Sequence, residues 1–468
     1  MKKIAIIGCG FSGTMTAVHL INNATHPFEL IMIGDRESFN TGIAYNPYSK
    51  KHLLNVIASR MSAFQDKPDH FLNWVSELEI FSGISSDLLA NKYLPRYLYG
   101  RYLKDIWQQT NQTPEAQMIR ITIKEACIVD IEASEGEITL ELSNGETVTA
   151  QYCVIASGNH LPRNPDILNT RFFSSPNYFR NSWDINSVRN HDPGFPVLIL
   201  GNGLTMADTV MGLVEHGFDN EIHTLSPHGF TILPHSYHGM GYSAITAELH
   251  ERLSLLELVR IINKHIKLAR KEGFTAEPVI DAIRPFTQKL WQNLTLNEKQ
   301  QFLSRIRYMW ESARHRIPFH IHQHIKQLSA CGKLLQHAGN LTGISGTGKH
   351  VNVRFFDRIQ QHEKELLDSG VINCTGPSSD FMQEQGGFLK KGLRKGIFLQ
   401  DHLKLGIVAN PVTLEVHNGK NEPQGNLVAI GSLLKGVLWE STAVKELREQ
   451  AVTISKHLVH KMKESSGC

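Results

Sequence analysis

The sequence is poor in three features that would assign the protein to a special class. No apolar run approaches the length of a membrane span, and no long block of one charge sign accompanies the net charge of +3. Cysteine is scarce, and no two cysteines form a Cys-x-x-Cys or Cys-x4-Cys pair, which argues against a disulfide framework, a zinc ribbon and a redox dithiol. The six cysteines are Cys9, Cys127, Cys153, Cys331, Cys374 and Cys468. We therefore expect a cytoplasmic protein that binds neither nucleic acid nor membranes.

The chain has instead the composition of a globular protein. Its 468 residues are 41% hydrophobic and 20% charged, which is enough for two or three domains. The short basic start is followed by the apolar run Ile4–Ile7, but this run leads into a glycine-rich turn and not into a small-residue cleavage site. We therefore predict a strand at this position and not a signal peptide.

The first glycine-rich turn has the spacing of a dinucleotide-binding fingerprint. Gly8-Cys9-Gly10-Phe11-Ser12-Gly13 follows the apolar run directly, and Asp35 stands 22 positions after Gly13. In a strand–turn–helix–strand unit, such glycines let the backbone approach a pyrophosphate, the helix N-terminus receives the phosphates, and the acid accepts from a ribose hydroxyl. The sequence thus predicts a dinucleotide site, with a tight turn that binds no ligand as the alternative.

A second fingerprint occurs about 190 residues further along. Val197–Leu200 is followed by Gly201-Asn202-Gly203-Leu204-Thr205-Met206-Ala207, in which Ala207 takes the place of a third glycine. The next predicted strand ends at Ser226–Gly229, a segment without the arginine that a 2′-phosphate normally requires, which favours NADH over NADPH unless His228 or a distant lysine substitutes. A chain that binds two dinucleotides usually passes electrons between them, and FAD with NADH or NADPH is the simplest pair.

These patterns predict an α/β fold with two Rossmann-like domains and a helical insertion. We expect the FAD-binding domain over 1–185 and 360–468, and the NAD(P)-binding domain over 186–359 with the insertion at about 245–330. A β meander or hairpin is predicted within 119–157. Apolar strands that end at Gly158 and at Gly376 mark where the chain leaves and re-enters the flavin domain. A last helix opens after Glu440 and extends through about His457, with Ser441 or Thr442 as its cap.

Seven segments together carry a recognisable pattern, namely 42–45, 52–56, 61–64, 69–74, 201–208, 310–316 and 439–448. In these segments the chain resembles a bacterial FAD/NAD(P)-binding flavoprotein family, most of whose members are uncharacterised. Two departures from the family pattern are Ser226–Gly229, where Ser-Arg-Arg-Gly is expected, and Gly431-Ser432, where Gly-Pro is usual. A more distant likeness to flavin-dependent N-hydroxylating monooxygenases covers Met61 to Trp74, Leu94–Arg96 and Ala156–Asn159.

The fingerprints and the resemblance together imply a set of cofactor-binding residues. Asn55 is expected at the flavin edge or in a structural turn, and Arg96 at a phosphate, at the substrate or in packing. Arg314–Arg316 is a further candidate for an anion site, against a solvated helix edge. The full set is Gly8, Gly10, Phe11, Ser12, Gly13, Asp35, Asn55, Met61, Arg96, Gly158, Gly201, Gly203, Leu204, Thr205, Gly376, Gly431, Trp439 and Glu440.

The resemblance implies an FAD-dependent oxidoreductase. We expect a monooxygenase that uses NAD(P)H and O₂ to hydroxylate a small polar substrate, for instance one that contains nitrogen. An NAD(P)H-dependent reductase or oxidase without oxygen insertion is the first alternative, and a flavin-binding redox sensor is the second. No catalytic base is assigned, and the histidines at 320, 322 and 324 are not expected to bind a metal. The sequence specifies neither the substrate nor the oligomeric state.

Overall fold

The computed structural model describes residues 1–134, 136–236, 241–250, 252–347, 350–384 and 386–464. The chain forms two compact units. The first unit comprises residues 1–160 and 379–468, and the second comprises residues 161–378.

The first unit is built on a six-stranded sheet in the order β17-β18-β7-β1-β2-β3. All its neighbouring strands are parallel except β17 and β18, which are antiparallel. The residues of β7 and most of those of β1 and β2 are buried, as expected for parallel strands covered on both faces. The strands are β1 (Lys2–Ile7), β2 (Phe28–Gly34), β3 (Arg120–Glu125), β7 (Tyr152–Ile155), β17 (Glu415–His417) and β18 (Pro423–Ala429).

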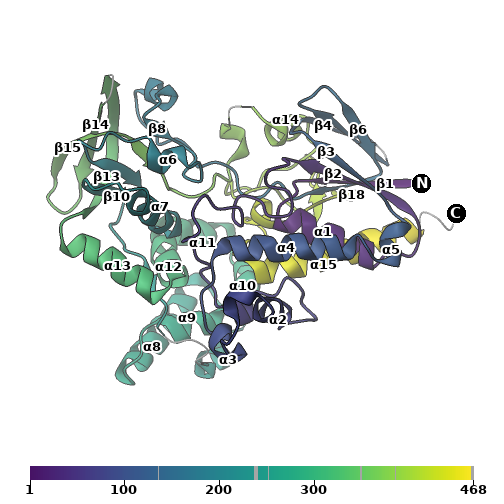
Figure 1. Ribbon diagram of the computed structural model, residues 1–468, viewed down its shortest axis with the longest axis horizontal. Helices are drawn as coiled ribbons and strands as arrows, with labels where there is room; N and C mark the ends of the chain where they lie inside the picture. Colours follow the sequence, from purple (N-terminus) through teal and green to yellow (C-terminus); the bar gives the residue numbers. More distant parts are fainter. Residues whose placement is uncertain (135, 237–240, 251, 348–349, 385, 465–468) are drawn as a thin grey trace. The chain divides into compact units, whose positions relative to one another are not determined.

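Three helices cover one face of this sheet, and a three-stranded meander packs on it from the other side (Figure 1). The helices are α1 (Phe11–Asn22), α4 (Arg96–Thr110) and α15 (Val444–Glu464), and α1 contacts both of the others. The meander consists of β4 (Ile128–Ser134), β5 (Glu137–Leu142) and β6 (Thr147–Ala150). Shorter elements are η1 (Ala58–Arg60), α2 (His70–Ser76), η2 (Glu79–Phe81), α3 (Ser86–Ala90), α5 (Pro114–Gln117), η7 (Phe381–Gln383), α14 (Phe388–Arg394) and η8 (Gly431–Leu434).

The meander is shorter than the sequence predicts. Residues 120–125 form β3, which pairs with β2 in parallel at the edge of the large sheet. None of the residues of β3 is buried, so the strand needs no continuous apolar run and can alternate in polarity as a hairpin strand does. The alternation in Arg120–Glu125 therefore did not distinguish the two arrangements.

The second unit is built on a seven-stranded sheet in the order β15-β14-β13-β10-β9-β16-β8. Its centre is parallel, and β14 and β15 extend it as an antiparallel ribbon. The strands are β8 (Tyr178–Phe179), β9 (Val197–Leu200), β10 (Ile222–Ser226), β13 (Leu334–Thr347), β14 (His350–Asp357), β15 (His362–Asp368) and β16 (Val371–Asn373).

The membership of β8 and β16 shows that the predicted domain boundaries were misplaced. Val371 pairs with Leu198 of β9 and with Tyr178 of β8, so these strands belong to the second unit. Along the chain, the boundaries between the units fall at 160/161 and 378/379, and not at the predicted 185/186 and 359/360. A buried apolar strand is compatible with either parallel sheet, so composition alone could not assign β16.

Helices of the second unit form two groups. The crossover helices α7 (Leu204–Glu215) and α13 (Phe319–Ala330) precede β10 and β13. Apart from η3 and α6, which precede β9, the remaining helices lie in the chain between β10 and α13. Part of them packs around a small core that contains Ile245, Val279 and Ile283. The other elements are η3 (Thr170–Ser174), α6 (Asn186–Arg189), β11 (Leu233–Pro234), η4 (Ser243–Glu248), α8 (Leu255–Lys271), α9 (Glu277–Ile283), η5 (Arg284–Phe286), α10 (Thr287–Asn293), α11 (Leu296–Gln301), η6 (Phe302–Ile306), α12 (Arg307–Arg314) and β12 (Arg316–Ile317).

A buried ion-pair network fastens this helical segment. Arg316, only 3% exposed, donates through Nη1 to Glu277 at 3.1 Å and to Asp281 at 3.0 Å. Burial would raise the pKa of Glu277, but hydrogen bonds from His235 and the Ser236 N–H and the charge of Arg316 lower it to about 2. Asp281 is thus bound to Arg316 from a separate element of the chain. Since Arg316 is committed to these carboxylates, it is not the exposed anion site considered above.

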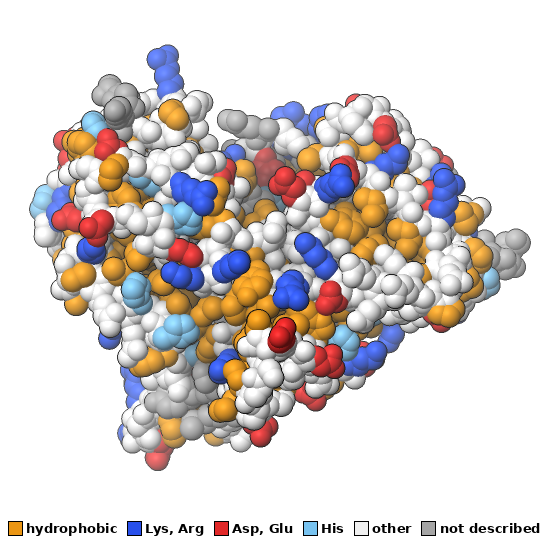
Figure 2. All heavy atoms as spheres, in the orientation of Figure 1, with side chains coloured by type: hydrophobic (Ala, Val, Ile, Leu, Met, Phe, Trp, Pro, Cys, Tyr) orange, Lys and Arg blue, Asp and Glu red, His pale blue; other side chains and the backbone are white. Residues whose placement is uncertain are grey.

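The surface carries mixed charge. On the face drawn in Figure 2, Lys and Arg side chains are interspersed with Asp and Glu, in keeping with the net charge of +3. Over the residues that the structure describes, no helix combines the length and the apolar composition needed to cross a bilayer.

Candidate nucleotide-binding sites

The first glycine turn connects β1 to α1 at a point where only glycine fits. Gly8 has φ +98°, and a Cβ built there would lie 2.2 Å from the Ala156 carbonyl oxygen. A Cβ on Gly13 would lie 1.9 Å from the Gly8 oxygen. Gly10 is the N-cap of α1, and a Cβ on it would lie 3.2 Å from the Gly42 Cα. Glycine therefore keeps the backbone close to β7 and leaves the first N–H groups of α1 without a side chain over them, which suits an anion.

This turn lies at the switch point of the first sheet. The strand β1 pairs with β2, to which α1 connects it, and on its other edge with β7. Ligands of open α/β sheets bind outside the carboxyl ends of the strands at such a point. Asp35 follows β2 directly, its side chain is exposed, and its Oδ2 accepts from the Ser38 N–H at 3.2 Å.

The carboxyl ends of β7 and β18 are tied together beside this turn. Ser432 Oγ donates to the Gly158 carbonyl at 2.5 Å, a bond that the proline usual at this position could not form. Gly431 has φ +83°, and a Cβ built on it would lie 3.9 Å from Ser12 Oγ, so the end of β18 lies next to the start of α1. Sequence reasoning selected Gly158, Gly431 and Ser12 separately, and the structure brings them together.

The start of α15 differs from the prediction. The helix begins at Val444 and continues to Glu464, beyond the expected end near His457. The Ser441 hydroxyl, proposed as a cap, donates instead to the Gly431 carbonyl at 2.8 Å. Gln450 completes this buried network, because its Oε1 accepts from the Gly431 N–H at 2.9 Å and its Nε2 donates to the Ser441 carbonyl at 3.3 Å. Sequence reasoning missed Gln450, since a glutamine inside a helix carries no local signal for such a role.

Arg96 holds the segment that carries Asn55. Its Nε donates to the Leu53 carbonyl at 2.9 Å and its N–H donates to the His52 carbonyl at 2.8 Å. Arg96 therefore has at least this structural role, and its contact with a phosphate or the substrate stays a prediction. Asn55 is half-buried in the turn beyond these contacts.

Three further residues of the set are mainly buried. The Phe11 ring is 6% exposed and lies 6.2 Å from the Tyr99 ring, so Phe11 can offer a ligand its backbone but little of its side chain. Met61 is 3% exposed and Trp439 is 4% exposed. Lys435 Nζ lies 5.1 Å from the centre of the Trp439 ring. Glu440 has φ +63°, a strained backbone conformation of a kind that clusters at functional sites.

The second glycine turn repeats the geometry of the first. Gly201 has φ +104°, and a Cβ built on it would lie 2.6 Å from the carbonyl oxygen of Cys374, the residue that follows β16. The strand β9 pairs with β10 on one edge and with β16 on the other, which makes this turn a second switch point. Gly203 is the N-cap of α7, and among the described residues other than its chain neighbours no atom lies within 4 Å of a Cβ built on it. Leu204 and Thr205 form the first positions of α7.

Asn202 stands between these two glycines with an unsatisfied side chain. Its Nδ2 and Oδ1 atoms are both shielded from solvent, and neither has a hydrogen-bond partner in the described part of the chain. Buried amides normally have partners, so this pair of atoms fits a site completed by a polar ligand. Sequence reasoning passed over Asn202, because the fingerprint specifies only the glycines.

Gly376 belongs with the second turn and not with the flavin domain. It has φ +90° and lies three residues beyond β16, the neighbour of β9. The prediction that Gly376 marks re-entry into the flavin domain is therefore wrong, because the chain crosses to the first unit only after Ser378.

An arginine distant in sequence lies beside the turn after β10. Arg358 Nη1 donates to the Pro227 carbonyl at 3.1 Å and lies 3.4 Å from His228 Nδ1. Sequence reasoning did not find it, since 130 residues separate Arg358 from His228.

The cysteines near both turns are poor nucleophiles. Burial, together with the charge of Asp35, raises the pKa of the Cys9 thiol to about 12. Burial also raises the pKa of Cys374 to about 12 and that of Cys153 further. Cys127 and Cys331 are exposed and unpaired, and Cys468 lies outside the described residues.

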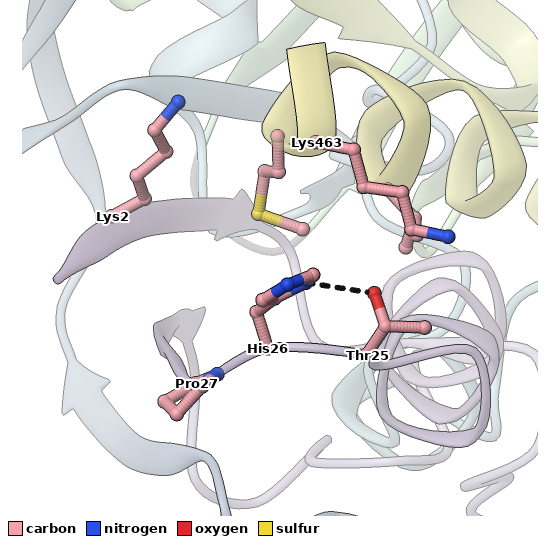
Figure 3. Close-up of a pocket in the computed structure, with 7 residues that line it drawn as sticks. Lys2, Thr25, His26, Pro27 and Lys463 are labelled. Atoms are coloured by element: carbon pink, nitrogen blue, oxygen red, sulfur yellow. Dashed lines mark hydrogen bonds between the residues drawn. The ribbon is translucent and has the colours of Figure 1, made fainter. Parts of the chain in front are cut away.

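A small cavity elsewhere in the first unit is not a nucleotide site. It has a volume of about 40 Å³ and is lined by Lys2, Thr25, His26, Pro27, Val459, Met462 and Lys463 (Figure 3). Lys2 begins β1, so the cavity lies at the amino end of the strand, opposite Gly8. Its volume suits a few water molecules.

The histidines at 320, 322 and 324 lie on α13. Within the ranges that the structure describes, no three His, Cys, Asp or Glu side chains are grouped so as to hold a metal ion.

Comparison with known proteins agrees with this geometry. Residues 5–160 match a family model described as FAD-NAD(P)-binding, which confirms the resemblance and the cofactor class predicted from the sequence. The uncharacterized protein YdhS of Escherichia coli is 24% identical over 227 residues, which are 46% of this chain and 40% of YdhS. Nitrosuccinic acid synthase npaA of Aspergillus oryzae is 24% identical over 240 residues, 46% of this chain and 35% of that protein. The match thus spans two fifths or less of each relative's own length.

Solved structures share the fold over nearly the whole chain. Ornithine N-hydroxylase KtzI of Kutzneria sp. 744 superposes with a TM-score of 0.64 at 12% identity over 99% of both chains. Ornithine hydroxylase PvdA of Pseudomonas aeruginosa gives 0.66 at 13% identity, over 98% of this chain and 99% of its own. Bacillithiol disulfide reductase Bdr of Bacillus cereus gives 0.57 at 12% identity, with the same coverage. These likenesses confirm the predicted α/β fold of a two-dinucleotide-binding flavoprotein.

Proposed function

We propose that the protein is an FAD-dependent monooxygenase that takes its reducing equivalents from NAD(P)H and hydroxylates a small, polar, nitrogen-containing molecule. The observation that carries the proposal is the pair of glycine turns at the two sheet switch points, Gly8–Gly13 and Gly201–Ala207. Two such turns in one chain provide for two dinucleotides, and a flavin with a nicotinamide is the pair that exchanges hydride.

The first unit is the proposed FAD site. The N–H groups at the start of α1 would hold the pyrophosphate, and Asp35, already at the end of β2, would accept from a ribose hydroxyl. The hydrogen bond between Ser432 and Gly158 holds the ends of β7 and β18 together beside this turn. FAD bound there would supply hydride acceptance and the reaction with O₂.

The second unit is the proposed NAD(P)H site. The open N-terminus of α7 at Gly203 leaves room for the pyrophosphate, where a side chain would crowd it. The Asn202 amide would then find partners among the polar atoms of the nucleotide. Protein residues in this scheme bind and orient, and no acid or base of the chain is assigned a proton transfer.

Oxygen insertion is favoured over thiol chemistry by the state of the cysteines. A disulfide reductase that works through its own dithiol needs a reactive pair, but Cys9, Cys153 and Cys374 are buried with raised pKa values. The hydroxylase neighbours and the nitrosuccinic acid synthase are named for chemistry on nitrogen-bearing molecules, which supports a similar substrate class here.

Bdr keeps a second function open, that of an NAD(P)H-dependent reductase or oxidase without oxygen insertion. The two functions differ in what happens to O₂. We would incubate the FAD-loaded protein with NAD(P)H, O₂ and a panel of diamines, ornithine, lysine and aspartate, and measure oxygen uptake, peroxide and N-hydroxylated product. The monooxygenase predicts that one amine yields hydroxylated product and suppresses peroxide. Peroxide equal to the oxygen consumed with every amine would instead support the oxidase.

A further inference from the structure

The strand ends next to the two glycine turns can be matched by their hydrogen bonds. The Gly8 N–H donates to the Ile33 carbonyl at 2.8 Å, and the Gly201 N–H donates to the Leu225 carbonyl at 2.8 Å. Ile33 also pairs with the residue before Gly8, and Leu225 with the residue before Gly201. Ile33 and Leu225 are therefore equivalent positions in the two units.

The residues two positions beyond these carbonyls differ in chemistry. In the first unit this position is Asp35, whose carboxylate suits a ribose hydroxyl and repels a phosphate. In the second unit it is Pro227, and the Arg358 guanidinium donates to its carbonyl at 3.1 Å. The second unit therefore has a positive charge where the first has a negative one.

Backbone contacts fix Arg358 at this place. Its N–H donates to the Ala338 carbonyl at 2.9 Å, and Ala338 pairs with Ser226 at the end of β10. The adjacent Asp357 is engaged by Lys364 at 2.8 Å, so that carboxylate is already paired with a cation other than Arg358. The turn after β14 thus delivers a guanidinium to the end of β10.

The guanidinium keeps donors for a ligand. Only Nη1 of the Arg358 side chain is engaged within the described residues, and the side chain is exposed. Arginine cannot accept a hydrogen bond, so His228 Nδ1 accepts in their 3.4 Å contact, and the proton of a neutral His228 ring is on Nε2. The His228 ring packs 4.5 Å from the Tyr308 ring and 5.6 Å from the Phe230 ring, which steadies its orientation.

We propose that Arg358, assisted by His228, binds the 2′-phosphate of NADPH and makes the second unit selective for NADPH over NADH. A planar guanidinium matches phosphate geometry and an Nε2–H adds a further donor. The inference rests on the proposed function in one respect, that the second unit is the nicotinamide site. It replaces the preference for NADH drawn from Ser226–Gly229, because folding supplies the arginine that this segment lacks.

Binding of nucleotide fragments tests the inference without turnover. We would titrate the FAD-loaded protein by calorimetry with adenosine 2′,5′-bisphosphate and with 5′-AMP. Arg358→Ala should weaken bisphosphate binding roughly tenfold to a hundredfold, as for a charged hydrogen-bond partner lost, and leave 5′-AMP unchanged. Arg354→Ala, at an exposed arginine of the strand β14 that precedes this turn, is the matched control and should change neither. Arg358→Lys, which keeps the charge but not the fork, should fall between.

The same variants separate this inference from the proposed function. In anaerobic hydride transfer, Arg358→Ala should lower kcat/KM for NADPH and spare that for NADH. Equal losses with both fragments, or bisphosphate binding unaffected by Arg358→Ala, would overturn the inference. A protein that binds the bisphosphate through Arg358 but never oxidises NADPH would refute the proposed activity alone. A protein that oxidises both nicotinamides equally, with Arg358→Ala unchanged, would refute the selectivity alone.

Discussion

The two glycine turns share one backbone conformation but differ in how much space surrounds their glycines. In both, the first glycine has a positive φ and approaches a carbonyl of the neighbouring strand, from Ala156 in the first unit and from Cys374 in the second. The first turn is then closed by Gly13, against which no side chain fits, whereas the second has Ala207. The first turn is thus built with no free space, and the second keeps an open N-cap at Gly203.

This contrast suits the two proposed ligands. A flavin stays bound through many turnovers, so a rigid, closely packed cradle is an advantage. A nicotinamide nucleotide must bind and leave in each cycle, and an open turn permits this. The surroundings agree, because one continuous core contains the first turn while the second unit has separate smaller cores.

The largest expected effect is that of Gly13→Ala. A methyl group 1.9 Å from the Gly8 oxygen forces the backbone apart, which should cost at least about 3 kcal/mol and abolish FAD retention. The matched control is Ala207→Gly, which should cost only about 1 kcal/mol of helix propensity. Flavin content and thermal unfolding of the purified proteins measure both. A yellow Gly13→Ala protein with the unfolding temperature of the parent would show that the first turn is not tight.

Breaking the ion network should affect the second unit alone. Arg316→Met leaves Glu277 buried without its cation, at a cost of about 3 kcal/mol. Arg260→Met, at an exposed position on α8, should change little. Hydrogen exchange would locate the loss, which we expect in residues 232–317 with FAD still bound. Release of FAD from Arg316→Met, with uniform exchange over both units, would contradict the separation of the two cores.

The pH dependence should also distinguish the units through His337. Burial, aided by the charge of His223, lowers the pKa of His337 to about 4, so folding favours its neutral ring. That contribution is complete above pH 6.5 and is lost as the pH falls towards 4, by roughly 2 kcal/mol. The Asp368 carboxylate, whose Oδ1 lies 3.3 Å from His223 Nδ1, outweighs burial and raises the pKa of His223. The contribution of His223 therefore has the opposite sign and is lost as the pH rises above 6.5.

His337→Phe should therefore flatten the acid side of the unfolding profile. The free energy of unfolding would be measured between pH 4 and pH 7, and the difference between parent and variant should shrink at lower pH. A difference that stays constant with pH would show that His337 titrates as freely in the folded protein as in the unfolded chain.

Gly203→Ala should have the smallest effect on stability and a selective effect on binding. Gly203 has φ −89° and open space around its Cα, so alanine fits and costs less than about 1 kcal/mol at this N-cap. The added methyl group would crowd the pyrophosphate and raise KM for NAD(P)H without loss of FAD. Steady-state kinetics and flavin content check this. An unchanged KM for NAD(P)H would contradict binding of the nucleotide at the second turn.

The sequence was most informative where chemistry is local. Both turns, with their flanking strands and helices, lie within segments of about 35 residues, and the structure forms them as expected. The features that depend on contacts between distant parts of the sequence were not predicted. The strand β16 lies in the second sheet between β9 and β8, so Gly376 and the domain boundaries differ from their predicted assignment. Arg316 and Arg358 contact partners that are distant in sequence. Side chains such as Gln450 and Asn202 gain meaning only from the atoms that folding places around them.

Anaerobic mixing of the FAD-loaded protein with NADPH, and separately with NADH, tests the central claim most directly. Flavin absorbance would be followed in a stopped-flow instrument over a range of nicotinamide concentrations. The account predicts saturable bleaching of the flavin, with NADPH effective at lower concentration than NADH. A flavin that stays oxidised with both nucleotides would contradict the claim that the two turns serve one electron-transfer reaction.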